Sequence, residues 1–129
     1  MSTTNEKTIT DFCNALRERS MDKLVSYLTE DVYYHNMPWD PVHGHAGVRK
    51  VLTAFVEGSK ITLEKMDIKN TTSAGNVAMN ERIEHWAAGN LKVQLPVVGV
   101  FTFNDKGKIA HWCDYFDAKT IQPLMDVLK

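Results

Sequence analysis

The apolar residues of this chain change their spacing near Ile61, and this change limits the folds that the chain can adopt. Before Ile61 the apolar residues recur every three or four positions, as on one face of a helix. From Ile61 to Asp117 they alternate with polar residues, as on one face of a β-strand, and helical spacing returns from Ile121 to Leu128. Helices followed by hairpin-linked strands predict an α+β domain, whose antiparallel sheet must curl to hide its apolar face. The inside of that curl is a natural place for a pocket.

The same periodicity, with its turn and capping signals, predicts the limits of each element. The predicted helices cover residues 4–19, 21–28, 48–56 and 121–128. The predicted strands cover residues 32–34, 61–69, 76–87, 91–103 and 108–117. A capping box, Thr3-x-x-Glu6, begins the first helix, and a Pro- and Gly-rich loop is expected over residues 37–47. Pro123 fits the last helix only in its first turn, because further along it would remove a backbone hydrogen bond.

Length, charge and composition exclude several classes of protein. A chain of 129 residues with 43% apolar content fits one domain, residues 1–129, with a single core and at most one pocket. Its 15 basic and 16 acidic residues are interspersed, so no basic stripe is available to follow a nucleic acid backbone. The N-terminus lacks the regions of a signal peptide, and no apolar run approaches the roughly 20 residues that span a bilayer. We therefore expect a cytoplasmic protein that binds neither nucleic acid nor membranes.

The cysteines and histidines do not form a pattern typical of metal or redox sites. Cys13 and Cys113 are isolated from each other, which predicts free structural thiols. His35, His43 and His45 lie in or beside the predicted loop, without a fourth ligand or a helical spacing. We expect no metal site, and we expect His35 to point away from the functional site.

Two of the predicted strands place charged residues on rows that should face the core. In one strand, alternation puts Arg82 and Glu84 on the same face, and in the last strand Asp114 shares a face with Trp112 and Phe116. A carboxylate among aromatic side chains costs several kcal/mol unless it is paired. Because an arginine between two carboxylates supplies that pairing, a buried group of Asp114, Arg82 and Glu84 is physically sensible.

Spacing alone leaves a second interpretation open. Arg82 and Glu84 would then form an exposed ion pair between strands, and Asp114 would cap or hydrogen-bond the chain locally. The two interpretations differ in burial, because only the first withdraws all three charged groups from solvent.

Four short motifs follow one another along the chain. They are Tyr34-His35-Asn36-Met37-Pro38, Glu81-Arg82-Ile83-Glu84, Gly99-Val100-Phe101 and Trp112-Cys113-Asp114-Tyr115-Phe116-Asp117. In these motifs and their order, the chain resembles the limonene-1,2-epoxide hydrolase family over nearly its whole length. The resemblance implies a curved, mostly antiparallel sheet wrapped around helices to form a cone-shaped pocket. It also implies a homodimer, and an enzyme without a metal or organic cofactor.

The resemblance further implies a role for each polar residue of the motifs. Asp114 would be the general base on a water that Tyr34 and Asn36 also hold, while Arg82 would bridge the two acids. Glu84 would protonate the epoxide oxygen. Such a pair works near neutral pH only if its surroundings push the two pKa values apart. The family has Asp where this chain has Glu84, whose extra methylene moves the carboxyl by about 1.5 Å.

The expected activity is the addition of water to an apolar epoxide, terpenoid or alicyclic, to give a vicinal diol in one step. The predicted walls of the substrate pocket are Trp39, Trp86, Leu95, Val97 and Trp112. Two alternatives stay open at this point, since one fold can host many functions. One is an isomerase or cyclase with Asp114 as base and Glu84 as acid, and the other is a non-catalytic module that binds a lipid-like ligand.

Overall fold

Residues 3–129 are described by a computed structural model, in which they form four helices and one six-stranded sheet. The helices are α1 (Thr4–Ala15), α2 (Met21–Val25), α3 (Gly44–Val56) and α4 (Ala118–Val127). The strands are β1 (Leu28–Asn36), β2 (Val42–His43), β3 (Thr62–Ala74), β4 (Val77–Ala88), β5 (Leu91–Phe103) and β6 (Ile109–Tyr115). The α+β class predicted from the change of periodicity is confirmed.

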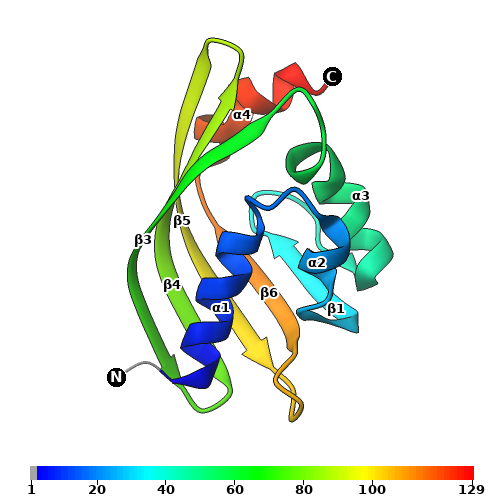
Figure 1. The fold of residues 1–129 in the computed structure, drawn as a ribbon, viewed down its shortest axis with the longest axis vertical. Coiled ribbons are helices and arrows are strands. Elements are labelled where there is room, and N and C mark those ends of the chain that lie inside the picture. Colours follow the sequence, from blue (N-terminus) through cyan, green and yellow to red (C-terminus); the bar gives the residue numbers. More distant parts are fainter. Residues whose placement is uncertain (1–2) are drawn as a thin grey trace.

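The sheet has the strand order β2-β1-β6-β5-β4-β3. Every neighbouring pair is antiparallel except β1 and β6, which run parallel. The long strands β3, β4 and β5 curve together, and α1 lies inside that curve (Figure 1). Helix α1 packs on β3 and β4, α3 packs on β1, and α4 packs on β5. The sheet therefore wraps around the helices, as expected from its need to hide one apolar face.

Irregular pairing contributes to the curvature of the sheet. The register of β3 against β4 shifts between Leu63 and Lys65 and again between Ile68 and Asn70. Such shifts are typical of β-bulges, which bend a strand and increase its right-handed twist. The bent β3 closes one side of the sheet over α1.

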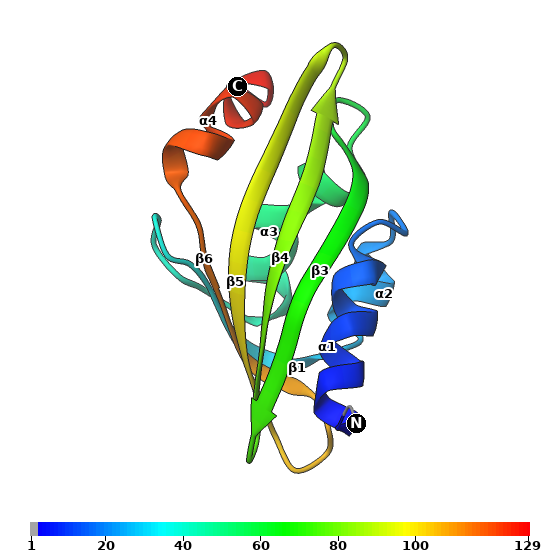
Figure 2. The same cartoon turned by 90° about the vertical axis from the view of Figure 1, so that its left-hand side faces the viewer.

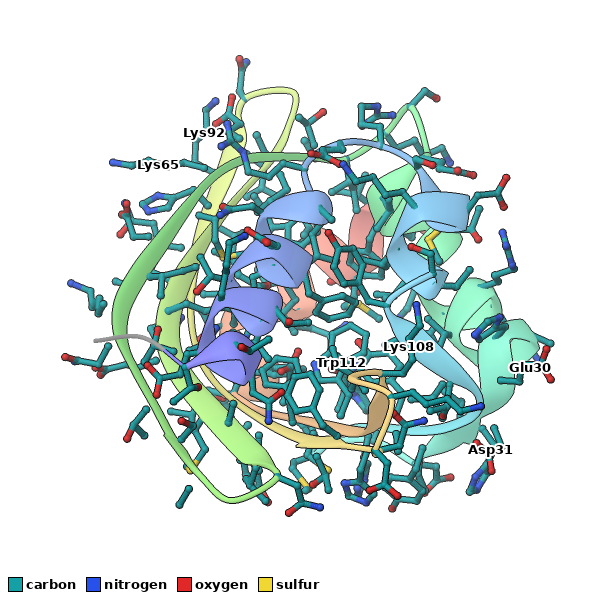
Figure 3. All side chains as sticks on the ribbon, turned by 60° about the horizontal axis from the view of Figure 1, so that its bottom comes forward. Glu30, Asp31, Lys65, Lys92, Lys108 and Trp112 are labelled. Carbon is teal, nitrogen blue, oxygen red and sulfur yellow. The ribbon has the colours of Figure 1, made fainter. Side chains whose placement is uncertain are left out.

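Alternation along β4 and β5 separates a buried inner face from an outer face. The buried inner residues of β4 are Ala78, Asn80, Arg82, Glu84 and Trp86. In β5, buried Val93, Leu95 and Val97 likewise alternate with exposed residues. Figure 3 shows Trp112 of β6 in the interior, while Lys65 and Lys92 point outward at the edge of the molecule. The period of two that predicted these strands thus also identified the residues that face the core.

The first two predicted helices end earlier in the structure than the sequence predicts. Helix α1 ends at Ala15, and the turn that follows contains Arg19 at a positive φ of 58°. Helix α2 ends at Val25, because Leu28 is already the first residue of β1, where it pairs with Ile109 of β6. Leu28 fits the helical spacing because it follows Leu24 by four residues, but in the structure it is a buried residue of a strand.

The predicted loop over residues 37–47 contains a short strand and the start of a helix. Strand β2 pairs with β1 through Tyr33 and His43. Helix α3 then begins at Gly44, earlier than predicted, with His43 as its N-cap residue. Gly44 has a φ of +72°, a left-handed conformation that favours glycine. This glycine allows the sharp change of direction from the edge strand into the helix.

The prediction for Pro123 is wrong, because this residue lies inside α4 and beyond its first turn. Helix α4 begins earlier than the apolar spacing suggests, since the Asp117 side chain accepts a hydrogen bond from Lys119 N at 2.8 Å and caps the helix. Pro123 cannot donate the usual backbone bond. Burial of Ile121 and Leu124 supplies the packing that holds the helix in place.

Among the residues described, no helix is long and apolar enough to cross a bilayer.

Candidate active site

A row of hydrogen-bonding side chains follows the inner face of β4. Arg82 Nη1 donates to Asn80 Oδ1 at 3.0 Å, and Arg82 Nε donates to Glu84 Oε2 at 3.0 Å. Trp86 Nε1 donates to Glu84 Oε1 at 3.0 Å. Because every second residue of a strand faces the same side, these four residues are neighbours and each is bonded to the next. The sequence predicted the contact between Arg82 and Glu84 but assigned no role to Asn80.

The guanidinium of Arg82 also reaches across β5 to β6. Arg82 Nη2 donates to Asp114 Oδ2 at 2.8 Å and lies 2.9 Å from Glu84 Oε2. Gly99 of β5 pairs with both Asn80 and Asp114, so it lies directly beneath this bridge. A Cβ at Gly99 would lie 2.6 Å from Arg82 Nη1, which is too close. The absence of a side chain at Gly99 therefore lets the arginine cross the middle strand.

Burial decides between the two interpretations of these charged residues. The exposed fraction is 0% for Arg82, 6% for Glu84 and 5% for Asp114. The exposed ion pair is therefore wrong, and the three groups form one buried cluster. Each carboxyl accepts one N–H from Arg82 and one from an indole, since Trp112 Nε1 donates to Asp114 Oδ1 at 2.9 Å in the way that Trp86 donates to Glu84.

The buried cluster holds one cation and two carboxyl groups. It is electrically neutral when one of the carboxyls keeps its proton, and a second buried negative charge would be unfavourable. Burial raises the pKa of Asp114, and the nearby Glu84 adds to this, while Arg82 and the bond from Trp112 oppose it. Burial disfavours the charged form of Arg82, but its interactions with acidic groups, Asp114 first among them, outweigh this effect and raise its pKa. Arg82 thus stays charged beside an aspartate whose pKa is raised.

Tyr34 and Asn36 lie beside Asp114 on the neighbouring strand β1. In the register of β1 against β6, Asn36 pairs with Asp114 and Tyr34 pairs with Trp112. The Tyr34 hydroxyl lies 2.8 Å from Asn36 Nδ2 and 3.1 Å from Oδ1. The Tyr34 ring stacks on Trp112 at a centroid distance of 3.9 Å. Burial raises the pKa of Tyr34 well above its usual value, so its hydroxyl keeps its proton and can donate a hydrogen bond.

These polar groups face an apolar cavity of about 320 Å³. All five predicted walls line it, and so do Tyr34, Asn36, Glu84 and Asp114. Arg82 lies behind the two carboxyls and does not line the cavity. Further lining residues that the sequence did not assign to the pocket are Leu16, Val51, Leu52, Phe55, Phe116, Ile121 and Met125. Most of these come from helices, where a face turned toward a cavity has the same spacing as a face turned toward the core.

The histidines of the predicted loop bind backbone or aromatic groups. His35 Nε2 lies 2.7 Å from the carbonyl oxygen of Trp39, and its Nδ1 lies 3.4 Å from the Tyr33 hydroxyl. His45 Nε2 lies 3.1 Å from the carbonyl oxygen of Leu28. Within residues 3–129, no group of three His, Cys, Asp or Glu side chains is arranged to hold a metal ion. The two cysteines are buried free thiols.

The comparisons with known proteins agree with this geometry. Residues 3–125 match the family described as limonene-1,2-epoxide hydrolase catalytic domain. Epoxide hydrolase EphG of Mycobacterium tuberculosis is 30% identical over 106 residues, which cover 82% of this chain and 68% of that relative. A solved LEH-like epoxide hydrolase from M. tuberculosis has 26% identity and a TM-score of 0.78, with 96% of this chain and 91% of that chain covered.

More distant solved structures share the fold. The epoxide hydrolase/cyclase-like enzyme SalBIII has 15% identity and a TM-score of 0.76, covering 90% of this chain and 92% of that chain. A protein of Shewanella putrefaciens assigned to the SnoaL-like polyketide cyclases has 13% identity and a TM-score of 0.79, covering 98% of each chain. These similarities identify a cone-shaped α+β fold, and the family match over residues 3–125 is more specific. The chain belongs to the limonene-1,2-epoxide hydrolase family.

Proposed function

We propose that this protein is an epoxide hydrolase that adds water to an apolar epoxide and releases a vicinal diol by one-step general acid–base catalysis, without a cofactor. One observation carries the proposal. Two buried carboxyls, bridged by the guanidinium of Arg82, line an apolar cavity beside Tyr34 and Asn36. Membership of the epoxide hydrolase family supports the reaction class.

Asp114 is the general base in this proposal. The water molecule sits between Asp114, Tyr34 and Asn36, which are neighbours across β1 and β6. Asp114 takes a proton from the water while the water oxygen forms a bond to an epoxide carbon. A pKa raised by burial makes Asp114 a stronger base than an exposed aspartate, provided that it is ionised at the working pH.

Glu84 is the general acid. As the epoxide C–O bond breaks, Glu84 gives its proton to the departing oxygen, and the product carries two hydroxyl groups. One N–H donates to each oxygen of Glu84, which leaves a lone pair on each oxygen for the proton. After release of the diol, Asp114 loses its proton and Glu84 regains one, which restores the starting state.

Arg82 stabilises the cluster before and after the step. The negative charge moves from Asp114 to Glu84, and both carboxyls touch the same guanidinium nitrogen, Nη2. The net charge of the three groups stays at zero throughout. A bridge that binds both charge states equally well needs little rearrangement during the reaction, which is a general feature of efficient electrostatic catalysis.

The cavity walls support an uncharged, apolar substrate of terpenoid or alicyclic type. In the described part of the chain, Glu84 and Asp114 are the charged side chains among the lining residues. The remaining surface is mostly aromatic and aliphatic, contributed by β4, β5, β6, α3 and α4. An anionic substrate would meet two acids and no cation among the described lining residues, whereas a hydrocarbon ring can fill the apolar volume with its epoxide directed at the two acids.

A panel of apolar epoxides incubated in ¹⁸O-labelled water tests the proposal. Hydrolysis by the purified protein should give diols that carry one labelled oxygen. A rearranged product without label would instead show an isomerase or cyclase, and binding without turnover would show a ligand-binding module. Asp114→Asn is the matched control, because the amide is nearly isosteric but cannot accept the proton, and it should lose at least about a hundredfold in rate.

Glu84→Gln separates the acid role from a structural one. The amide is too weak an acid to protonate the departing oxygen, so nearly all activity should be lost while the fold is kept. Circular dichroism and the thermal unfolding midpoint check the fold. A Glu84→Gln protein that hydrolyses epoxides as fast as wild type would show that the proton comes from another group.

A further inference from the structure

The structure assigns a positioning role to Trp86: we propose that its indole N–H holds the longer side chain of Glu84 so that the carboxyl lies against Arg82 in the orientation for proton transfer. The inference rests on the proposed function, in which Glu84 is the acid. It goes further because it names the residue that makes a glutamate workable at this position.

Glu84 is held from two sides by its neighbours on the inner row of β4. Arg82 Nε donates to Oε2 and Trp86 Nε1 donates to Oε1, both at 3.0 Å. A glutamate has one more rotatable bond than an aspartate and samples more positions when it is unrestrained. One donor on each oxygen fixes both the place and the plane of the carboxyl group.

Trp86 is itself held in place by its surroundings. Its side chain is 94% withdrawn from solvent, since its exposed fraction is 6%. The ring of Phe55, from α3, packs edge-on against it at a centroid distance of 5.6 Å and an angle of 75°. A residue fixed by packing can orient a functional group within the small tolerance that catalysis requires. Trp86 therefore acts as a rigid support for Glu84 as well as a cavity wall.

The length of the acid and the indole contact depend on each other. An aspartate at position 84 would be shorter by about one C–C bond, roughly 1.5 Å. A bond of 3.0 Å to Trp86 that lengthened by much of that distance would no longer be a hydrogen bond. An aspartate at position 84 would keep only the contact with Arg82. The Trp86 N–H would then have no effect on the position of that carboxyl.

A double-mutant cycle tests this dependence. Trp86→Phe keeps an aromatic wall but removes the N–H, so in the Glu84 protein kcat should fall about tenfold or more, with KM changed by less than about threefold. In the Glu84→Asp protein the same Trp86→Phe change should alter kcat by less than about twofold, because the contact is already lost. Equal factors in the two backgrounds would overturn the proposal.

Trp39→Phe is the matched control. Trp39 also lines the cavity, and within the described residues its indole is not bonded to either catalytic carboxyl. Removing this indole should change the rate by the same factor in the Glu84 and Glu84→Asp proteins. A background-dependent factor for Trp39 would show that the coupling is not specific to Trp86.

The indole N–H signals in a ¹H–¹⁵N spectrum give a second readout that needs no turnover and no Trp86 variant. Glu84→Asp should shift the Trp86 signal and speed its exchange with solvent, and should leave the Trp39 signal in place. An unmoved Trp86 signal in an enzyme that hydrolyses epoxides would overturn the role of Trp86 alone. A moved signal in a protein without any epoxide turnover would overturn the proposed function and, with it, the catalytic meaning of the contact.

Discussion

Asp114 differs from an ordinary aspartate because it is buried and shares Arg82 with a second acid. Burial raises the pKa of Asp114. On acidification its carboxylate therefore takes up a proton at a pH above the value of about 4 that is usual for aspartate. The same shift has a thermodynamic consequence. Because the folded state binds the proton more tightly than the unfolded chain, Asp114 contributes stability at low pH that is lost as the pH rises through its folded pKa.

The pH profile of kcat/KM therefore has an expected acid limb. Activity should fall as the pH drops through the raised pKa of Asp114, with a slope of one proton, at a pH clearly above about 4. In unfolding experiments, the free energy of unfolding of wild type should decrease relative to Asp114→Asn as the pH rises through the same window. Stopped assays and urea unfolding across pH 3–8 measure both. Full activity retained down to about pH 4 would contradict the assignment of Asp114 as the base.

Gly99 shows how a residue without a side chain can be part of a functional site. It lies on β5 under the bridge from Arg82 to Asp114, and a Cβ there would approach Arg82 Nη1 at 2.6 Å. Gly99→Ala should displace the guanidinium, lower stability by roughly 1–3 kcal/mol and reduce kcat. Gln94→Ala, an exposed position on the same strand, is the control and should change neither quantity much. A fully active Gly99→Ala enzyme would mean that the arginine can move without loss.

At the scale of secondary-structure elements, Arg82 connects two strands that are not neighbours. It originates from β4 and bonds Asp114 of β6 across β5. Sequence alternation predicted which residues of β4 face inward, because this depends only on the period of a strand. It could not predict that Gly99 would lie beneath Arg82, because that contact depends on the register between β4 and β5.

The errors of the prediction have a similar physical origin. Leu28 was assigned to a helix because local spacing cannot distinguish the last turn of a helix from a buried strand residue. The predicted start of α4 is too late because the predicted strand extends to Asp117, whereas β6 ends at Tyr115 and Asp117 caps the helix. The apolar face of α3 was predicted correctly, but its exposure to a cavity depends on how α3 packs against the sheet. Periodicity thus predicts which side of an element is apolar, and tertiary packing decides what that side contacts.

The bridge between β4 and β6 should be measurable as stability. Arg82→Ala leaves two buried carboxyls without a cation and should cost roughly 3–5 kcal/mol at neutral pH. Arg82→Lys should cost less, because it keeps the charge but not the planar fork that reaches both acids. Urea unfolding midpoints measure the difference. The loss of unfolding free energy in Arg82→Ala should become smaller as the pH is lowered and the carboxyls take up protons. An Arg82→Ala protein as stable as wild type at neutral pH would contradict the buried bridge.

At the scale of the whole molecule, the sheet has a second, outer face with a different character. In Figure 2 the strands β3, β4 and β5 face the viewer, and no described helix lies in front of them. Met79, Val98 and Tyr115 on this face have exposed fractions of 38%, 37% and 47%. Val98 and Tyr115 are direct partners across β5 and β6. Large apolar side chains grouped on one open face are typical of a surface that contacts another molecule.

We propose that this outer face pairs two copies of the chain as a homodimer, the assembly implied by the resemblance to the family. A twofold dimer needs one self-complementary patch, and the neighbours Val98 and Tyr115 can meet the same residues of a second copy.

Light scattering coupled to size exclusion should give twice the chain mass for wild type. Val98→Glu should shift the protein toward the monomer, since a carboxylate at the centre of an apolar contact loses its hydration without gaining a partner. Ser59→Glu, at an exposed position in the loop after α3, adds the same charge elsewhere and should remain dimeric. The proposed catalytic residues face the opposite side of the sheet. The rate of epoxide hydrolysis by monomeric Val98→Glu should therefore stay within a few-fold of the wild-type rate. A wild-type monomer, or a Val98→Glu dimer as tight as wild type, would show that this face is not the interface.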